Sequence, residues 1–355
     1  MIRDDMKLAH ESVWKRSKSG IETILVLLVI LIAIAVFAHF IGSVVFNRII
    51  IKMFINLILV LGLQVFMGNS DILWFPHVGF MGIGAYASVI FSMSPLQKMI
   101  SLRELYPILS ELHLGFVPAL IGGAIISALI AGIVGVALMR LNDFPAVIAG
   151  FALLIVIHVI LLQWTPITNG PQSLFGVERE TYLLQGVTWA CLILVVAYLF
   201  KESNIGLKLR ASRDDLISSA SIGVNITLMR WTSFVLSAFI AGIGGGLYAH
   251  FITSFTANAF FLNQMFLILA MLVIGGPRTI TGAVLGTILV TCVYQSFRWL
   301  ENFLGSSHIF DFDFVGLTEI MLSIAMILIL YIRPEGLVTR NELTISGVKK
   351  LLLHR

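Results

Sequence analysis

The sequence predicts an all-α polytopic membrane protein with about ten transmembrane helices. Composition, the length of the apolar runs and the placement of basic residues lead to this fold class. Hydrophobic residues make up 58% of the 355 residues and charged residues only 12%, whereas soluble domains are roughly 45–50% apolar and about 25% charged. The mean hydropathy of +0.99 agrees with this assignment. The chain is therefore expected to lie in a lipid bilayer.

Apolar runs indicate where the chain crosses that bilayer. A helix of about 20 residues spans the roughly 30 Å of hydrocarbon. The eighth run is short and ends in Gly275-Gly276-Pro277, so a half-span or a broken helix packed against protein is an alternative to a full crossing there. The ten runs that satisfy or approach the required length are 22–46, 49–69, 77–95, 116–139, 145–163, 183–200, 231–252, 263–276, 281–299 and 316–332.

The basic residues predict which side each loop faces. With ten spans and a cytoplasmic N-terminus, 17 Lys and Arg residues fall inside and 6 fall outside, which is the positive-inside pattern. About twenty polar residues precede the first apolar run, the wrong order and too long for a cleaved signal. We therefore expect cytoplasmic tails at 1–21 and 341–355, on either side of a transmembrane domain at 22–340.

Ionisable residues are too scattered to predict a catalytic or metal centre. An enzyme needs titratable groups clustered near one face, and an ion-coupled carrier usually needs them at mid-membrane. Cys191 and Cys292 lie inside apolar runs and provide neither a disulfide framework nor metal-ligand spacing. The net charge of +4 follows from topology, so no nucleic-acid binding is predicted. Isolated ionisable residues, for which packing or interface roles are expected, occur at His39, His158, His250 and Glu319.

One long polar stretch, residues 201–230, separates two apolar blocks and is cytoplasmic in this topology. The residues from Asp214 to Asn225 indicate a short helix, a tight turn at Gly223 and a second short segment. We interpret this stretch as a docking surface for a soluble partner; a solvated loop is the alternative. The chain contains no G-x-x-x-x-G-K-[ST] phosphate loop, so any ATP that drives it must be bound by another subunit.

Two amide side chains are candidates for a polar pathway. Asn56 and Gln64 lie eight residues apart in the second run, which places them on one face of a helix. Burying an amide costs free energy unless it finds a partner or water. They are the best candidates for a polar pathway lining, against the more ordinary interpretation that they form interhelical hydrogen bonds.

Small residues predict close helix packing, because lipid provides little hydrophobic drive for helices to associate and small faces let backbones approach. Lining of a pathway is the alternative for each position. The glycines singled out are Gly82, Gly84, Gly242, Gly246, Gly282 and Gly286.

Four motifs in order resemble one family of transport proteins. Residues 77–86, HVGFMGIGAY, resemble G-H-x-x-F-x-G-I-G-A-Y. Residues 204–251 resemble L-R-A-x-R-E-D-E-x-A-A-x-A-x-G-I-N-V followed by F-x-x-S-A-x-x-A-G-x-x-G-x-L-Y-A. Residues 275–286 resemble G-G-x-G-S-x-x-G-P-x-x-G, and 333–337 resemble R-P-x-G-L. Over about residues 50–340 the chain is similar to LivM-type permeases of branched-chain amino acid ABC importers.

The resemblance implies a type II ABC importer permease in a bacterial inner membrane. Such a permease pairs with a second homologous permease, two cytoplasmic ABC ATPase subunits that bind the ATP, and a periplasmic solute-binding protein. The chain itself then carries no cofactor and is not an enzyme. The polar stretch contains the coupling helix, which lies in a groove of the ATPase. The residues that the resemblance assigns to ATPase docking are Arg210, Arg213, Asp214, Asp215, Gly223 and Asn225.

Departures from the family pattern bear on the solute. Asp71, Trp74 and Pro76 stand where the family has Gly, Ser and Gly, and residues 167–173, ITNGPQS, replace L-T-G-G-P-N-G. We therefore add Asp71, Trp74 and the neighbouring His77 to the pathway candidates. A branched-chain or other hydrophobic amino acid is the expected solute; urea, short amides and organic acids are alternatives on the same machinery. A stand-alone channel or secondary carrier is the alternative mechanism.

Overall fold

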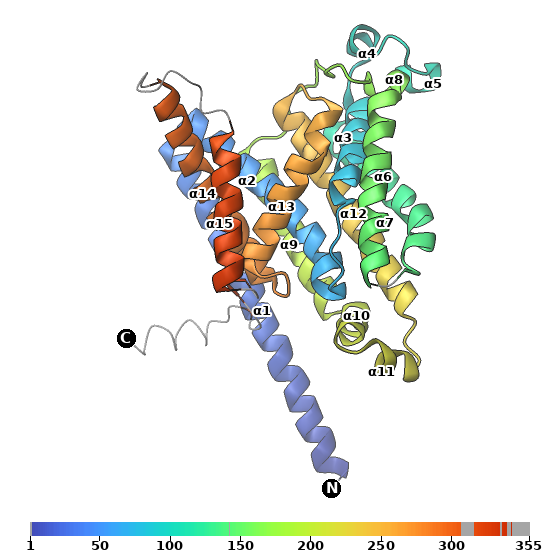
Figure 1. Ribbon diagram of the computed structural model, residues 1–355, viewed down its shortest axis with the longest axis vertical. Coiled ribbons are helices and arrows are strands. Elements are labelled where there is room, and N and C mark those ends of the chain that lie inside the picture. Colours follow the sequence, from blue (N-terminus) through green and yellow to red (C-terminus); the bar gives the residue numbers. More distant parts are fainter. Residues whose placement is uncertain (1, 142, 307–315, 334–335, 339–341, 343–355) are drawn as a thin grey trace.

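The computed structural model describes residues 2–141, 143–306, 316–333, 336–338 and 342, and what it describes is helical apart from loops and one isolated bridge between Leu174 and Phe255. The helices run mostly along the long axis of the molecule (Figure 1). Their bounds are α1 Ile2–Ile41, α2 Val44–Leu63, the π-helix η1 Gln64–Gly68, α3 His77–Ser92, α4 Pro95–Ser101, α5 Pro107–Ser110, α6 Phe116–Leu138, α7 Asp143–Gln163, α8 Thr165–Thr168, α9 Leu183–Glu202, α10 Asn204–Asp214, α11 Leu216–Ser221, α12 Ile226–Ile252, the 3₁₀-helix η2 Ala257–Phe260, α13 Leu262–Gly275, α14 Ile280–Ser306 and α15 Leu317–Ile332.

The predicted all-α polytopic fold is confirmed. Within the described residues, eight helical segments are long and apolar enough to cross a membrane. Two shorter apolar helices, α3 and the described part of α15, correspond to the third and tenth predicted spans. At 1.5 Å per residue the 16 residues of α3 extend only about 24 Å. The cytoplasmic placement of the two termini stays a prediction.

The predicted boundary between the first two spans is displaced. The first span was expected to end at residue 46, but α1 ends at Ile41 and α2 begins at Val44. Gly42 has φ +66°, a conformation that glycine adopts without strain. The Ser43 hydroxyl then accepts from the Phe46 amide as the cap of α2. A glycine followed by a capping serine therefore breaks the helix inside an apolar run.

The seventh span also begins earlier than predicted, at Ile226 rather than 231. The Asn225 side chain accepts from the Leu228 amide at 3.1 Å and caps α12. Arg230, predicted to lie in the polar stretch, is buried in α12 and donates to the Leu141 carbonyl oxygen at 3.2 Å.

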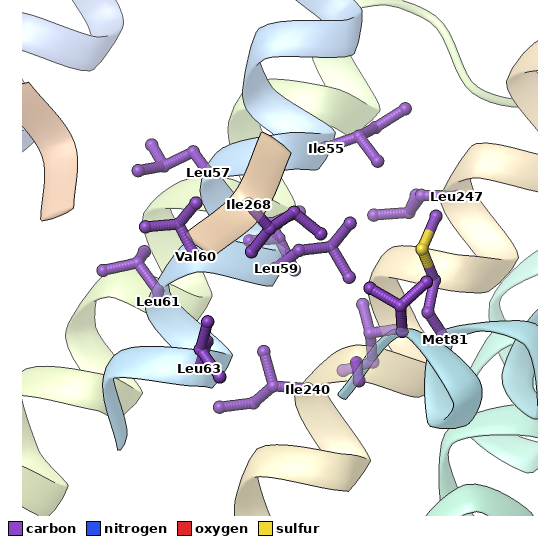
Figure 2. Close-up of a cluster of buried hydrophobic side chains, with 14 of the residues drawn as sticks. Ile55, Leu57, Leu59, Val60, Leu61, Leu63, Met81, Ile240, Leu247 and Ile268 are labelled. Carbon is purple, nitrogen blue, oxygen red and sulfur yellow. The ribbon is translucent and has the colours of Figure 1, made fainter. Parts of the chain in front are cut away.

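The second span lies at the centre of the molecule. In the most apolar part of α2 and η1, 89% of the residues are buried, against 22% for the first span. Its leucines and isoleucines meet Met81 of α3, Ile240 and Leu247 of α12 and Ile268 of α13 (Figure 2). The buried amides of this span, Asn56 and Gln64, therefore face other helices rather than lipid.

Glycines permit the closest helix contacts in the bundle, where α3, α6 and α12 pack against one another. A Cβ at Gly84 would overlap the backbone of Gly242, and a Cβ at Gly242 would lie 2.7 Å from the Cα of Ala124. A Cβ at Gly82 would lie 2.8 Å from the Leu161 side chain. These positions bring α3, α6, α7 and α12 together without space for a methyl group.

The remaining glycines singled out occupy comparable positions. A Cβ at Gly246 would collide with the Leu120 side chain, and a Cβ at Gly286 with the carbonyl oxygen of Met271. Gly282 has the Gly276 carbonyl oxygen 2.5 Å from the place a Cβ would take. The turn between α13 and α14 therefore folds tightly against both helices.

Candidate functional site

The polar stretch forms two short helices, α10 and α11, at one end of the bundle. The N-terminal part of α1 projects beyond that same end, whereas α4, α5 and α8 lie at the opposite end (Figure 1). The Ser203 hydroxyl caps α10 by accepting from the Gly206 amide. Asp215 caps α11 by accepting from the Ile217 and Ser218 amides at 2.9 and 3.0 Å. Hydrogen bonds from the side chain and then the backbone of Ser218 hold the pKa of Asp215 below its usual value.

The two arginines assigned to docking also bind within the chain. Arg210 donates to the Lys201 carbonyl oxygen at 2.8 Å and to Glu202 at 3.2 Å. Arg213 donates to the exposed Asp214 at 3.2 Å and to the Gly68 carbonyl oxygen at 3.1 Å. Arg213 therefore joins α10 directly to the end of η1.

The outer surface of this stretch is more apolar than the sequence reasoning recognised. Ile217 and Ile222 are 81% and 80% exposed, although both lie among polar residues. Gly223 follows them with φ +82° and open space where a Cβ would be. The signal available in the sequence was a pair of isoleucines on either side of the serines in residues 218–221.

An ion pair fixes the beginning of the stretch. Lys201, at the end of α9, pairs with Glu342, and the two side chains are only 6% and 15% exposed. Glu342 also accepts from the amides of Ile280 and Thr281 at 3.0 and 2.9 Å and from the Thr281 hydroxyl at 2.6 Å. Burial opposes the charged form of Glu342, but Lys201 and these donors outweigh it and lower the pKa of the carboxyl group. Glu342 thereby joins α9 to the first turn of α14.

The substituted segment before α3 lies at the same end of the bundle. Asp71 has φ +60° and its carboxylate lies 3.9 Å from the Arg278 guanidinium, in the turn between α13 and α14. Trp74 is buried, with its ring centroid 4.9 Å from that of Phe66 and 5.1 Å from that of Phe234. Asp71 therefore lies on the surface beside a second loop, whereas Trp74 fills the interior between η1 and α12.

Gln64 occupies an unusual position in the π-helix η1. It is fully buried, and neither amide atom of its side chain has a hydrogen-bond partner in the structure. Such an arrangement costs free energy, and π-helical turns are frequent at functional sites. The lining of a pathway by Gln64 stays a prediction.

His77 is fully engaged by the protein. Its Nε2 lies 2.9 Å from the Leu59 carbonyl oxygen and its Nδ1 lies 3.1 Å from the Ser237 hydroxyl. Because a carbonyl oxygen can only accept, Nε2 carries the proton and Nδ1 accepts from Ser237. The ring joins α2, α3 and α12 and leaves neither nitrogen for a solute.

Asn56 is at the edge of a hollow that the sequence reasoning did not predict. The Gln264 amide group donates to the Asn56 carbonyl oxygen at 3.0 Å. The hollow, of about 410 Å³, lies between α2 and α14, and we call it the basic hollow. Three cationic side chains line it, those of Arg48, Lys52 and Arg298. In the sequence these three cations served only as topology signals, although Arg48, Lys52 and Asn56 recur every four residues along one helix.

The chain is similar in sequence to several transport permease proteins. LivM, a high-affinity branched-chain amino acid transport system permease protein of Salmonella typhimurium, is 27% identical over 331 residues, covering 82% of this chain and 70% of LivM. NupC, a nucleoside ABC transporter permease protein of Lactococcus lactis, is 25% identical over 231 residues, covering 59% and 68%. LivH, a probable branched-chain amino acid transport permease protein of Methanocaldococcus jannaschii, is 28% identical over 167 residues, covering 46% and 50%.

No solved structure gives a significant match to the chain. The family model described as the permease component of the branched-chain amino acid transport system matches residues 45–330. That range contains α2 through most of α15, and therefore the central span, the polar stretch and the basic hollow. The chain thus belongs to the family of branched-chain amino acid transport system permease components, and it is a multi-pass protein of the inner membrane.

Proposed function

We propose that this chain provides the solute pathway of an ABC importer and that α10 and α11 receive the motion of a separate ATPase. A second homologous permease, two ABC ATPase subunits that bind the ATP and a periplasmic solute-binding protein complete the assembly. The observation that carries this proposal is the pair of short helices between α9 and α12, which presents exposed isoleucines at the end of the bundle predicted to be cytoplasmic.

The surface of this stretch supports protein docking. Ile217 and Ile222 expose apolar surface in the middle of a polar segment, and apolar side chains that a partner buries commonly supply the binding energy of an interface. Asp214 adds an exposed charge beside them. A groove on an ATPase that encloses α11 would bury both isoleucines and leave the charges at its rim.

The contacts behind the stretch support transmission of a displacement. Arg213 donates to the Gly68 carbonyl oxygen, so movement of α10 acts on the end of the central span. Lys201 and Glu342 connect the end of α9 to the start of α14. Packed elements with such direct links move as rigid bodies between discrete arrangements.

Gly223 permits a sharp functional test. Its φ of +82° is disfavoured for side chains with a Cβ, and the space around it is empty, so a substitution acts through the backbone rather than through a clash. Gly223→Val should strongly reduce ATP-dependent uptake of radiolabelled leucine by the co-expressed importer. Gly223→Asn is the matched control, because asparagine tolerates positive φ, and it should retain most of the uptake. Membrane levels of both variants are measured by immunoblotting.

Equal uptake by wild type and Gly223→Val, at equal membrane levels, would show that the loop does not transmit the motion. A pull-down supplies an independent readout. ATPase subunits should copurify with the wild-type chain and be lost when Ile217 and Ile222 are both replaced by Asp. Solute flux through this chain alone in liposomes, with no ATPase attached, would favour a channel or secondary carrier instead.

A branched-chain amino acid is the proposed solute, since that is the transport described for the family and for LivM. A relative described as a nucleoside permease indicates that the scaffold accommodates other solutes. Urea, short amides and organic acids remain the alternatives to be compared in the uptake assay.

A further inference from the structure

The basic hollow is formed by two polar stripes that face one another. On α2 the stripe consists of Arg48, Lys52 and Asn56, at intervals of four residues. On α14 the lining side chains are spaced by three and four residues, which is one face of a helix: Thr291, Tyr294, Gln295 and Arg298. Helices α12 and α13 contribute the apolar walls. The first residues of α2 and the last of α14 lie at the end of the bundle away from α10 and α11 (Figure 1).

Positive charge within the hollow is arranged by depth. Arg48 and Arg298 are exposed, Lys52 is half-buried, and Asn56 is only 3% exposed. The Lys52 ammonium group lies 5.9 Å from the centre of the Tyr294 ring. Among the residues that the structure describes, no carboxylate lies within ion-pair distance of any of the three cations.

Such an arrangement is complementary to an anion. Like charges held together in a partly desolvated site repel one another, and a bound carboxylate would convert this repulsion into charge-assisted hydrogen bonds. The amides of Asn56 and Gln295 are suited to the polar remainder of such a solute. Apolar residues such as Met53, Leu267 and Met271 provide a surface for a short aliphatic chain.

A second hollow of about 580 Å³ continues the first one and shares Lys52, Leu267 and Tyr294 with it. Its lining includes the amide side chains of Asn258, Asn263 and Gln264. The acidic member of the two linings, Glu319, is exposed and lies in this second hollow. Among the described residues, the two linings therefore contain three cations and one acid, and Lys52 lies where the two hollows join.

We propose that the basic hollow is a binding site for the carboxylate group of the transported solute, with Lys52 and Arg298 as its main ligands. This inference rests on the proposed function and narrows it: amino acids and organic acids are accepted, whereas urea and short neutral amides are not. Arg48 lies at the exposed rim of the hollow, and its positive charge attracts the anion toward the deeper Lys52.

Chemical protection of Lys52 tests the proposal without ATP or partner subunits. The full-length chain is placed in nanodiscs of phosphatidylcholine and treated with acetic anhydride, and acetylation of each lysine is followed by mass spectrometry. Isovalerate and propionate should slow the acetylation of Lys52, whereas propionamide, which has nearly the same shape as propionate but no charge, should not. Lys208, exposed on α10, is the internal control, and its acetylation should be unaffected by any of the three probes.

Variants identify the second ligand. Arg298→Gln should raise the concentration of propionate that protects Lys52 by about tenfold or more, because one charge-assisted contact is lost. Arg179→Gln is the matched control: Arg179 is exposed, lies over the Tyr182 ring and is absent from the hollow's lining. In this variant propionate should protect Lys52 at the same concentration as in the wild type.

Three results would overturn the proposal: equal protection by propionamide, no protection by either carboxylate, or protection that is unchanged in Arg298→Gln. Replacing part of the phosphatidylcholine with anionic phosphatidylglycerol separates a solute site from a lipid site. Protection of Lys52 by that lipid but by neither carboxylate would assign the hollow to lipid head groups and refute a solute role. Absence of a copurifying ATPase would refute only the importer proposal, since protection is measured on the chain alone.

Discussion

Removing the Glu342 carboxylate should destabilise the described fold more than most surface changes would. Glu342 is 15% exposed, pairs with Lys201 and accepts from two amides and a hydroxyl at the start of α14. Glu342→Ala leaves Lys201, at 6% exposure, as an uncompensated charge, and breaking a buried pair in this way costs about 3–5 kcal/mol. Glu342→Gln retains one oxygen acceptor and should cost less, about 1–3 kcal/mol.

Thermal unfolding of the purified chain in detergent measures this effect, and Glu342→Ala should lower Tm by about 5 °C or more. Lys201→Met should be milder than Glu342→Ala, because the amide and hydroxyl donors still satisfy the carboxylate. The double variant, Glu342→Ala with Lys201→Met, should be less destabilised than the sum of the two single variants. The difference gives the coupling free energy between the two side chains.

The pH dependence supplies a further check on the same pair. The folded-state pKa of Glu342 is lowered below its ordinary value of 4.5, so the carboxyl group binds protons more readily in the unfolded chain. Its stabilising contribution is complete above about pH 4.5 and is lost as the pH falls through the folded-state pKa. The difference in Tm between wild type and Glu342→Gln should therefore narrow on acidification. A Glu342→Ala variant that melts within about 1 °C of the wild type at pH 7 would refute the reasoning.

Three other predictions follow from local geometry. Gly84→Ala should lower the free energy of unfolding by about 1–3 kcal/mol or prevent the protein from accumulating in the membrane, since its Cβ would overlap Gly242. Gly132→Ala is the control and should be neutral or slightly stabilising, because the nearest atom to its Cβ would be 3.7 Å away. Equal effects of the two variants on membrane expression and on melting temperature would contradict this prediction. Asp215→Ala should increase hydrogen exchange in residues 216–221 because α11 loses its cap, whereas Asp215→Ser should protect these amides as the wild type does. Asn56→Leu should destabilise by about 1–3 kcal/mol because the Gln264 amide loses its acceptor, and the loss should shrink when Gln264 is also replaced by Leu.

Periodicity and charge predicted the spans well because lipid imposes a simple requirement on length and polarity. The boundary near residue 46 was missed because an apolar run does not show which glycine will adopt positive φ, as Gly42 does. The start of α12 was missed for a related reason. Asn225 was recognised as part of a family motif, but its role as a helix cap depends on the local backbone.

The candidate site was less predictable than the fold. Asn56 and Gln64 were selected from their spacing, yet Asn56 binds Gln264 while Gln64 lies in a π-helix without a partner. Their different surroundings depend on which helices pack beside α2, and a single sequence does not contain that information. Arg48 and Arg298 lie far apart in the sequence and line one hollow because α14 packs against α2.

The central span connects the two ends of the molecule, so a tilt of this span moves residues at both ends. From Val44 to Gly68 it comprises 25 residues, a rod of about 37 Å. Arg213 holds its lower end at Gly68, and Arg48 and Lys52 stand near its upper end. A tilt of roughly 5° about one end would displace the other by about 3 Å, comparable to the length of one hydrogen bond. A displacement of α10 that tilts the span by this amount would therefore change the contacts of Arg48 and Lys52 at the other end.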